Sequence, residues 1–238
     1  MTREKLVAVF FAAVMLLVLA ASAGAVDGTI EINQAKVLAA GPFPYLIGAS
    51  GSYRLTGNLV VPSGVDGLIV SANYVTIDLN GFSIIGDGGA VYGISASVVG
   101  TTVENGTVTG FSQAGVYVGD DSIVKSVHVD SNSAGYGIDA GNNAVIEGCT
   151  ANSNSRGINC RLSRCSIIGN TLNNNSAAGV NVVGSGSLIL HNTIGGDAGG
   201  IFASDATTAY GENVFNGNTS NVSGGTSMKN NVCTGVIC

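Results

Sequence analysis

Six polar or aromatic side chains in the middle of the chain have the chemistry needed to hold a sugar. Tyrosine rings stack on sugar rings, aspartate and asparagine bond hydroxyl groups, and arginine pairs with the carboxylate of a uronate. If the chain coils with the repeat described below, the six lie within adjacent coils, about 5 to 10 Å from one another. We therefore predict a ligand-binding face formed by Tyr117, Tyr136, Asp139, Arg156, Asn159 and Arg161.

Part of this set also suits a reaction at a uronate. Arg156 or Arg161 would neutralise the carboxylate, Tyr136 would carry a proton, and Asp139 would orient the substrate or act as the base. Tyr136, Asp139 and Arg156 are thus the candidates for a catalytic role, in an elimination or an epimerisation. The alternatives are ligand contact without catalysis and a polar surface without a site.

A second acidic feature is the pair Asp120 and Asp121. Adjacent carboxylates can divide acid and base roles, because one raises the pKa of the other. Clustered carboxylate and amide oxygens also suit calcium, and Asn142-Asn143 should lie beside the pair. We favour a solvated acidic turn, so we expect no cofactor and no metal beyond weak calcium binding there.

A sequence repeat indicates which elements would position these residues. A glycine followed by Ile or Val returns at intervals of 22, 22, 20, 22 and 21 residues, from Gly93-Ile94 to Gly200-Ile201. Such a period, with β-branched residues and polar corners, is typical of a solenoid of stacked strands. We predict an all-β, single-stranded parallel β-helix of about 7 coils of 20–22 residues, with three short strands per coil.

Aligning the repeats predicts which residues are buried. Four apolar columns should point inward, the first running from Ile94 through Val116 and Ile138 to Ile201. Two polar columns should form ladders of side-chain hydrogen bonds at the corners. The first is Asn58, Asn80, Asn170, Asn192 and Asn213, and the second is Asn132, Asn154, Asn175, Asp197 and Asn218.

The ends of the chain are expected to differ from the coils. Residues 1–25 begin with Arg3 and Lys5, continue with an apolar stretch over 6–21 and finish with small residues, which predicts a cleaved signal peptide rather than a membrane anchor. Residues 26–52 should form an N-terminal cap, 53–221 the β-helix and 222–238 a C-terminal cap. We therefore expect a secreted or periplasmic protein that is free of the membrane after cleavage.

Five cysteines fit an oxidising compartment. The equal spacing of the pairs Cys160, Cys165 and Cys233, Cys238 predicts a disulfide within each pair, which leaves Cys149 as a buried thiol. Without residues 1–25, the 9 basic and 15 acidic residues become 7 and 14, and no basic residues cluster. A nucleic-acid partner is therefore not expected.

Three segments carry a resemblance to a known family. Gly51-Ser-Tyr-Arg-Leu-Thr-Gly-Asn58, Val75-Thr-Ile-Asp-Leu-Asn-Gly-Phe82 and Ile168-Gly-Asn-Thr-Leu172 resemble the right-handed parallel β-helix repeat proteins of the pectin-lyase-like superfamily, over about residues 27–221. The resemblance implies a right-handed coil and a working face on the outer side of the first strand of each coil. It does not imply one activity, because the superfamily contains lyases, hydrolases, epimerases and adhesins.

Two motif likenesses within that superfamily are partial. Tyr136-Gly-Ile-Asp139 resembles the tyrosine–aspartate motif of mannuronan epimerases, but Ala140-Gly141-Asn142 follows where Pro-His-Asp would be expected. Asp120-Asp121 resembles the paired aspartates of polygalacturonases without their accompanying motifs.

Together these features favour a monomeric β-helix protein that contacts a polysaccharide or cell-surface glycan without catalysis. A uronate polysaccharide lyase or epimerase is the first alternative, and a structural or adhesive scaffold about 35 Å long is the second. The shortness of the coils is the main reason for favouring binding over catalysis, because enzymes of this fold build cleft walls from long insertions. Only residues 85–92 lengthen a coil enough to wall a groove.

Overall fold

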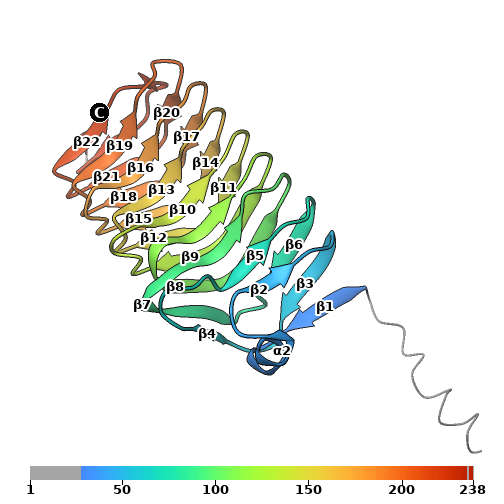
Figure 1. Ribbon diagram of the computed structural model, residues 1–238. Helices are drawn as coiled ribbons and strands as arrows, with labels where there is room; N and C mark the ends of the chain where they lie inside the picture. Colours follow the sequence, from blue (N-terminus) through green and yellow to red (C-terminus); the bar gives the residue numbers. More distant parts are fainter. Residues whose placement is uncertain (1–27, 235, 238) are drawn as a thin grey trace, which may run out of the picture.

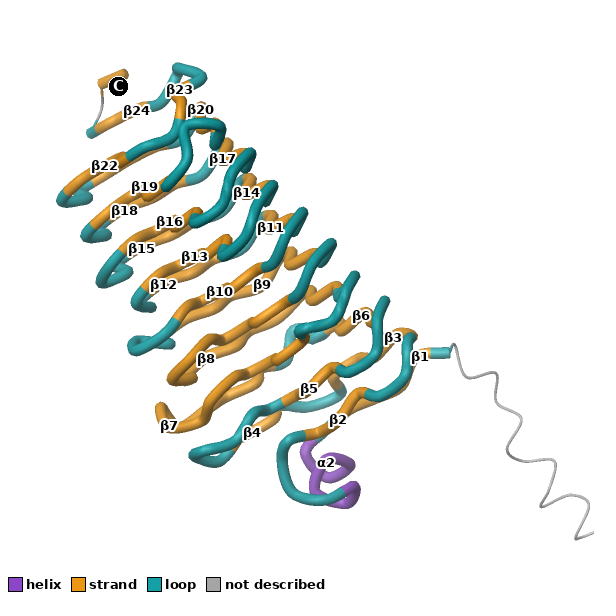
Figure 2. Tube along the Cα trace, turned by 45° about the horizontal axis from the view of Figure 1, so that its top comes forward, coloured by secondary structure: helices purple, strands orange, loops and turns teal. Residues whose placement is uncertain are grey.

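The chain forms a solenoid in which every coil lies on the one before it. The computed structural model describes residues 28–234 and 236–237, so the predicted signal peptide lies outside the described residues. Parallel strands stack into three long sheets joined at polar corners, with about nine turns of the coil (Figures 1 and 2). The predicted fold class is confirmed, although about nine turns replace the predicted seven.

Each sheet takes one strand, or one part of a long strand, from each coil. The first sheet contains β2 (Tyr45–Ile47), β5 (Leu68–Val70), parts of β7 (Ser83–Ala96) and β8 (Thr102–Val118), β10 (Tyr136–Ala140), β13 (Arg156–Cys160), β16 (Ala178–Val182), β19 (Gly199–Ala203) and β22 (Ser220–Ser223). The second contains β1 (Thr29–Ile32), β3 (Gly51–Leu55), β6 (Val75–Asp78), parts of β8 and β9 (Ile123–Asp130), β11 (Val145–Glu147), β14 (Ser166–Ile168), β17 (Leu188–Leu190), β20 (Ala209–Gly211) and β23 (Thr226–Ser227). The third contains β4 (Leu59–Val61), parts of β7, β8 and β9, β12 (Thr150–Asn152), β15 (Thr171–Asn173), β18 (Thr193–Gly195), β21 (Val214–Asn216) and β24 (Val232–Cys233).

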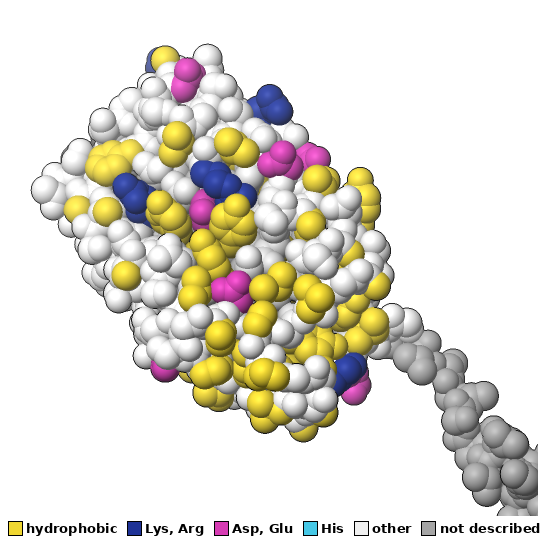
Figure 3. All heavy atoms as spheres, in the orientation of Figure 1, with side chains coloured by type: hydrophobic (Ala, Val, Ile, Leu, Met, Phe, Trp, Pro, Cys, Tyr) yellow, Lys and Arg dark blue, Asp and Glu magenta, His cyan; other side chains and the backbone are white. Residues whose placement is uncertain are grey.

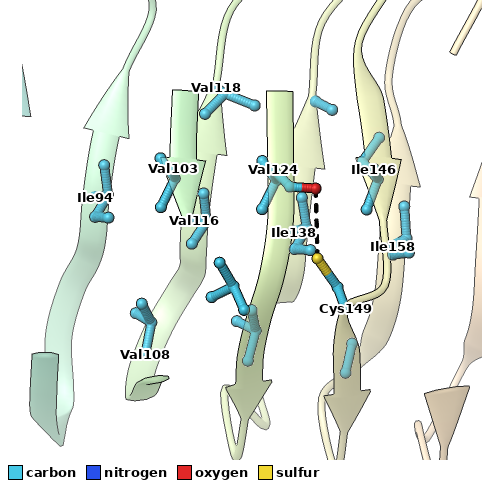
Figure 4. Packing of buried hydrophobic residues seen from close by; sticks show 14 of the residues in the cluster. Ile94, Val103, Val108, Val116, Val118, Val124, Ile138, Ile146, Cys149 and Ile158 are labelled. Atoms are coloured by element: carbon cyan, nitrogen blue, oxygen red, sulfur yellow. Dashed lines mark hydrogen bonds between the residues drawn. The ribbon is translucent and has the colours of Figure 1, made fainter. Parts of the chain in front are cut away.

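The interior is a set of stacked apolar columns. Ile94, Val116, Ile138 and Ile158 lie directly above one another in the first sheet and have no exposed surface (Figure 4). The predicted columns of the second and third sheets are also buried, apart from Tyr210 at the C-terminal end of the second-sheet column, which is partly buried. Burial of β-branched side chains along one axis stabilises each coil mainly through its two neighbours.

The recurring glycine is explained by the coil that lies above it. A Cβ atom on Gly137 would come 2.6 Å from the main-chain oxygen of Gly157 and 2.9 Å from the Asn154 amide nitrogen. Gly115 and Gly157 meet the next coil's asparagine amide at similar distances. Since real Cβ atoms essentially never approach so closely, the glycine makes room for the corner ladder.

Both predicted ladders exist. Asn154 Oδ1 accepts from the main-chain and amide nitrogens of Asn132 at 3.0 Å each, and Asn154 in turn donates to Asn175. At the other corner Asn170 bonds to Asn192 and Asn192 to Asn213, and the ladder extends to Asn231.

The column that contains Asn170, Asn192 and Asn213 was also predicted to include Asn58 and Asn80, but these two side chains bond differently. Asn58 accepts from the main-chain nitrogen of Ser83, and Asn80 donates to the Leu55 oxygen from a left-handed backbone conformation.

The N-terminal end is covered by the helix α2 (Gln34–Ala40), which is capped by the Asn33 side chain. Val37 is the residue of α2 that packs into the core, with 1% of its surface exposed. The range predicted to form the cap also contains β1 and β2, which pair in parallel with β3 and β5 as ordinary coils do. These extra coils account for the larger number of turns.

The four cysteines among the described residues are buried in the core or at its corners. Cys160 and Cys165 form the predicted disulfide. Cys149 is a buried thiol as predicted: its Sγ lies 3.4 Å from the Val124 oxygen (Figure 4), and burial raises its pKa to about 11. In the other predicted pair, Cys238 lies outside the described residues. At this end β24 pairs antiparallel with β25 (Val236–Ile237).

The longer coil at residues 85–92 is a bulge within β7 rather than a long loop. The pairing of β7 with β8 shifts between Ile85 and Ala90 and again between Ala90 and Tyr92. Asp87 folds the extra residues by accepting from the main-chain nitrogens of Gly89 and Ala90. The bulge is therefore compact, which adds little wall to the outer face of the first sheet.

Candidate functional site

The predicted ligand-binding residues lie together on the outer face of the first sheet, over β8, β10 and β13. The strand register places Tyr117, Asp139 and Asn159 in one outward column. Tyr136 and Arg156 lie side by side in the neighbouring column, two residues before the inward Ile138 and Ile158. In Figure 3, basic and acidic side chains lie among yellow ones near the middle of the molecule's visible face.

Arg161 joins part of this face into a rigid cluster. Its Nη1 lies 3.4 Å from Asp139 Oδ1, its Nη2 donates to the main-chain oxygen of Val118 at 2.8 Å, and its Cζ lies 4.1 Å from the centre of the Tyr117 ring. The guanidinium thus spans two coils and makes a cation–π contact, an ion pair and a main-chain bond at once.

Asp139 is the buried centre of the cluster. Its Oδ1 accepts from Asn159 Nδ2 at 2.7 Å, and only 7% of the residue is exposed. Burial raises the pKa of Asp139, while the bond from Asn159 and the charge of Arg161 oppose that rise. Asn159 and Arg161 both contact Oδ1 of this carboxylate, so Asp139 organises the face better than it would serve a substrate as a base.

Tyr136 and Arg156 form a more open pair. The Arg156 Cζ lies 5.6 Å from the centre of the Tyr136 ring, and both residues are half-buried. Arg156 Nε is buried, yet it has no hydrogen-bond partner within the described residues. A buried donor without an acceptor is costly, and the residue is only half-buried, so an anionic group that contacts the exposed part of this guanidinium would offset that cost.

Two further residues belong to the face and were absent from the predicted set. Tyr92 packs against Tyr117 with ring centres 5.5 Å apart, and Asp66 Oδ1 accepts from the Tyr92 main-chain nitrogen at 3.2 Å. Burial raises the pKa of both side chains. Each directly precedes a glycine, as Tyr136 and Arg156 do. The glycine after Asp66 is followed by Leu68 instead of Ile or Val, so the repeat does not reveal the position of Asp66.

The outward column continues into later coils. Asn181 Nδ2 donates to Asn159 Oδ1 at 2.7 Å, and Phe202 follows Asn181 in register. The tyrosine and arginine end of the face therefore passes into an amide and an aromatic ring, which extends the surface along the solenoid axis.

Asp120 and Asp121 serve the turn after β8. Asp120 accepts from the main-chain and amide nitrogens of Asn142 at 2.8 and 3.2 Å, which lowers its pKa. Asp121 accepts from Asn143 Nδ2 at 2.7 Å. The two carboxylates thus bond to the next coil's turn, the arrangement expected of a structural acidic turn, and weak calcium binding remains a prediction.

In the part of the chain that the structure describes, no group of three or more His, Cys, Asp or Glu side chains is placed to hold a metal ion. Among the helices of that part, none has the length and apolar character needed to span a bilayer.

Comparison with known proteins identifies the family. Residues 63–232 match the family described as right handed beta helix region, which is more than half of the chain. The chain therefore belongs to the right-handed β-helix family, in agreement with its resemblance to pectin-lyase-like repeat proteins and with the expected hand of the coil. No curated protein and no solved structure matches the sequence.

Proposed function

We propose that this β-helix protein is exported and binds a uronate-containing glycan along the outer face of its first sheet, as a monomer and without catalysis. The observation that carries the proposal is the Arg156 guanidinium, whose Nε is buried without a partner beside the Tyr136 ring. A uronate offers a carboxylate for Arg156 and an apolar sugar face for Tyr136.

The cluster around Asp139 would serve as the rigid floor of this site. Arg161, Asn159 and Tyr117 already bond to or pack on neighbouring groups, so little conformational entropy would be lost there on binding. The absence of long loops around these strands favours an open surface that contacts a few units of a long polymer.

Binding to oligogalacturonate and oligomannuronate, measured by calorimetry, tests the proposal. Arg156→Gln should weaken binding about tenfold or more, because a charge-assisted hydrogen bond contributes roughly 1.5–3 kcal/mol. Arg156→Lys should recover part of the affinity, since lysine keeps the positive charge but lacks the planar guanidinium that can donate two hydrogen bonds to one carboxylate.

Arg164→Gln is the matched control, because Arg164 lies in the next turn and bonds to Asn143 Oδ1 at 2.7 Å, away from the face. Equal affinity of the Arg156 and Arg164 variants for the uronates would contradict the proposal. No binding of any glycan by the unmodified protein would leave the scaffold as its function.

The second candidate is a uronate lyase or epimerase, favoured by the raised pKa of the Asp139 carboxyl beside Arg161. New ultraviolet absorbance from an unsaturated uronate, or a changed epimer ratio by NMR, would support it. The activity must be lost in Asp139→Asn and kept in Arg164→Gln; no reaction with pectate, alginate or hyaluronan supports binding alone.

A further inference from the structure

The third sheet carries a polar cavity that is separate from the face around Arg156. It has a volume of about 400 Å³ and lies over β12, β15, β18 and β21, on a different side of the coil from the first sheet. That volume lies within the range of small-ligand sites. The side chains around it are Asn152, Asn173, Asn174, Thr193 and Asn216.

The cavity exists because one coil lacks a side chain in an outward column of asparagines. Asn152, Asn173, Gly195 and Asn216 follow one another in register. Asn173 donates to Asn152 Oδ1 from its main-chain nitrogen at 3.1 Å and from its amide at 3.3 Å. Gly195 ends this ladder, so the Asn173 oxygen faces a rung where no side chain lies.

Amide oxygens converge on the two glycines beneath the cavity. Asn173 Oδ1 lies 3.1 Å from the position of a Cβ on Gly195, and Asn174 Oδ1 lies 2.6 Å from that of a Cβ on Gly196. Throughout the described residues, the side chains of Asn174, Thr193 and Asn216 form no hydrogen bond to the protein. The cavity is therefore lined by acceptors and donors that are free for a ligand.

The chemistry of the lining selects an uncharged, hydroxyl-rich ligand. A carboxamide both donates and accepts, and a hydroxyl group offers the complementary pair. The lining contains no basic side chain that would favour an anion and no carboxylate that would favour a cation. We propose that this cavity is a second glycan site, which takes one neutral hexose unit through Asn173, Asn174 and Asn216.

The two sites are independent, because they lie on different sheets and differ in charge. The absence of an aromatic side chain from the lining removes stacking, so binding of a single unit should be weak. A protein with both sites would hold a uronate polymer on one side and a neutral glycan on the other.

Proton–nitrogen correlation NMR of the full protein tests the proposal through the asparagine side-chain amides. Cellohexaose, laminarihexaose and mannohexaose are the probes, each titrated to millimolar concentration. At least one should shift the amide signals of Asn174 and Asn216 in a saturable way, and leave those of Asn159 and Asn181 on the first sheet in place.

Asn174→Ala combined with Asn216→Ala should weaken that titration at least fivefold, and both residues are exposed, so the fold should be kept. Asn181→Ala is the control on the first sheet and should leave the titration unchanged. Equal shifts with oligogalacturonate, shifts confined to the first sheet, or no saturable shift with any of the three probes would overturn the second site, whatever the result for Arg156.

Discussion

At the scale of single residues, Asp197 occupies an asparagine position in a buried ladder. Its Oδ1 accepts from the Asn175 amide at 3.0 Å, as Asn175 and Asn154 accept from their own neighbours. Its Oδ2 would lie 2.7 Å from a Cβ on Gly179, where the other coils have an amide nitrogen beside the glycine. That oxygen is buried and has no hydrogen-bond partner in the described residues. A protonated carboxyl would therefore mimic asparagine better than a carboxylate does.

Burial raises the pKa of Asp197 to about 6, which sets the sign of its effect on stability. The native state holds this proton more tightly than the unfolded chain, whose carboxyl has a pKa near 4. The stabilisation is thus complete below about pH 4 and is lost as the pH rises to about 6. The loss is at most about 3 kcal/mol, and less after solvent screening.

We predict that Asp197→Asn raises the free energy of unfolding at pH 8 by about 1–3 kcal/mol and leaves it nearly unchanged at pH 4. Chemical denaturation of both proteins across this range measures the difference, which cancels the contributions of other carboxyl groups. Asn154→Asp, two coils earlier in the same ladder, should lower the free energy of unfolding more at pH 8 than at pH 4. A gain for Asp197→Asn that is equal at both pH values would contradict the explanation.

At the scale of elements, the asparagine ladders link successive coils through side chains, in addition to the sheet hydrogen bonds and the apolar core. Asn192 Oδ1 accepts from the main-chain and amide nitrogens of Asn170 at 2.9 and 3.0 Å. Its own amide nitrogen lies 2.9 Å from the Ile167 oxygen, 2.9 Å from the Leu190 oxygen and 3.0 Å from Asn213 Oδ1. The side chain therefore satisfies polar groups of three successive coils.

Asn192→Ala should lower the free energy of unfolding by about 2–5 kcal/mol, because it leaves more than one buried main-chain group without a partner. Urea denaturation followed by circular dichroism measures the change. Asn216→Ala, an exposed asparagine one coil later, should alter stability by less than about 0.5 kcal/mol. Similar losses for the two variants would show that the ladder contributes nothing specific.

The repeat made these elements predictable from the sequence, because one residue type returns at each position of the coil. The coil that contains β2 was counted with the cap, since β2 lacks the Gly-Ile or Gly-Val step that marks the later coils. The side-chain geometry of the site was not predictable either. Arg161 bonds to Val118, a residue 43 positions earlier, and this reach depends on a side-chain conformation rather than on strand register.

The burial of Asp139 illustrates the same limit. Period-two alternation assigns this residue to the outer face, and the strand register does place it in the outward column with Tyr117. Asn159 and Arg161 nevertheless cover its carboxylate, so an outward position became a buried one. The sequence could therefore place the candidate residues in adjacent coils, but it could not separate Asp139 from the open pair of Tyr136 and Arg156.

At the scale of the whole molecule, stability depends on the ends, because each coil contacts only its neighbours. An end without a cover exposes apolar columns and unpaired strand edges, which favour association of solenoids. α2 closes the N-terminal end: Val37 enters the core, and the Gln34 side chain bonds both main-chain groups of Val60. Leu38, the next residue of the helix, is 59% exposed.

We predict that Val37→Asp loosens α2 and exposes the first coils, whereas Leu38→Asp leaves the cap in place. A carboxylate at position 37 would have to be buried without a partner, so the free energy of unfolding should fall by about 3 kcal/mol or more. Light scattering after size-exclusion chromatography should then show association that increases with concentration for Val37→Asp only. Because both variants add one negative charge to the same helix, equal behaviour would mean that α2 does not protect this end of the solenoid.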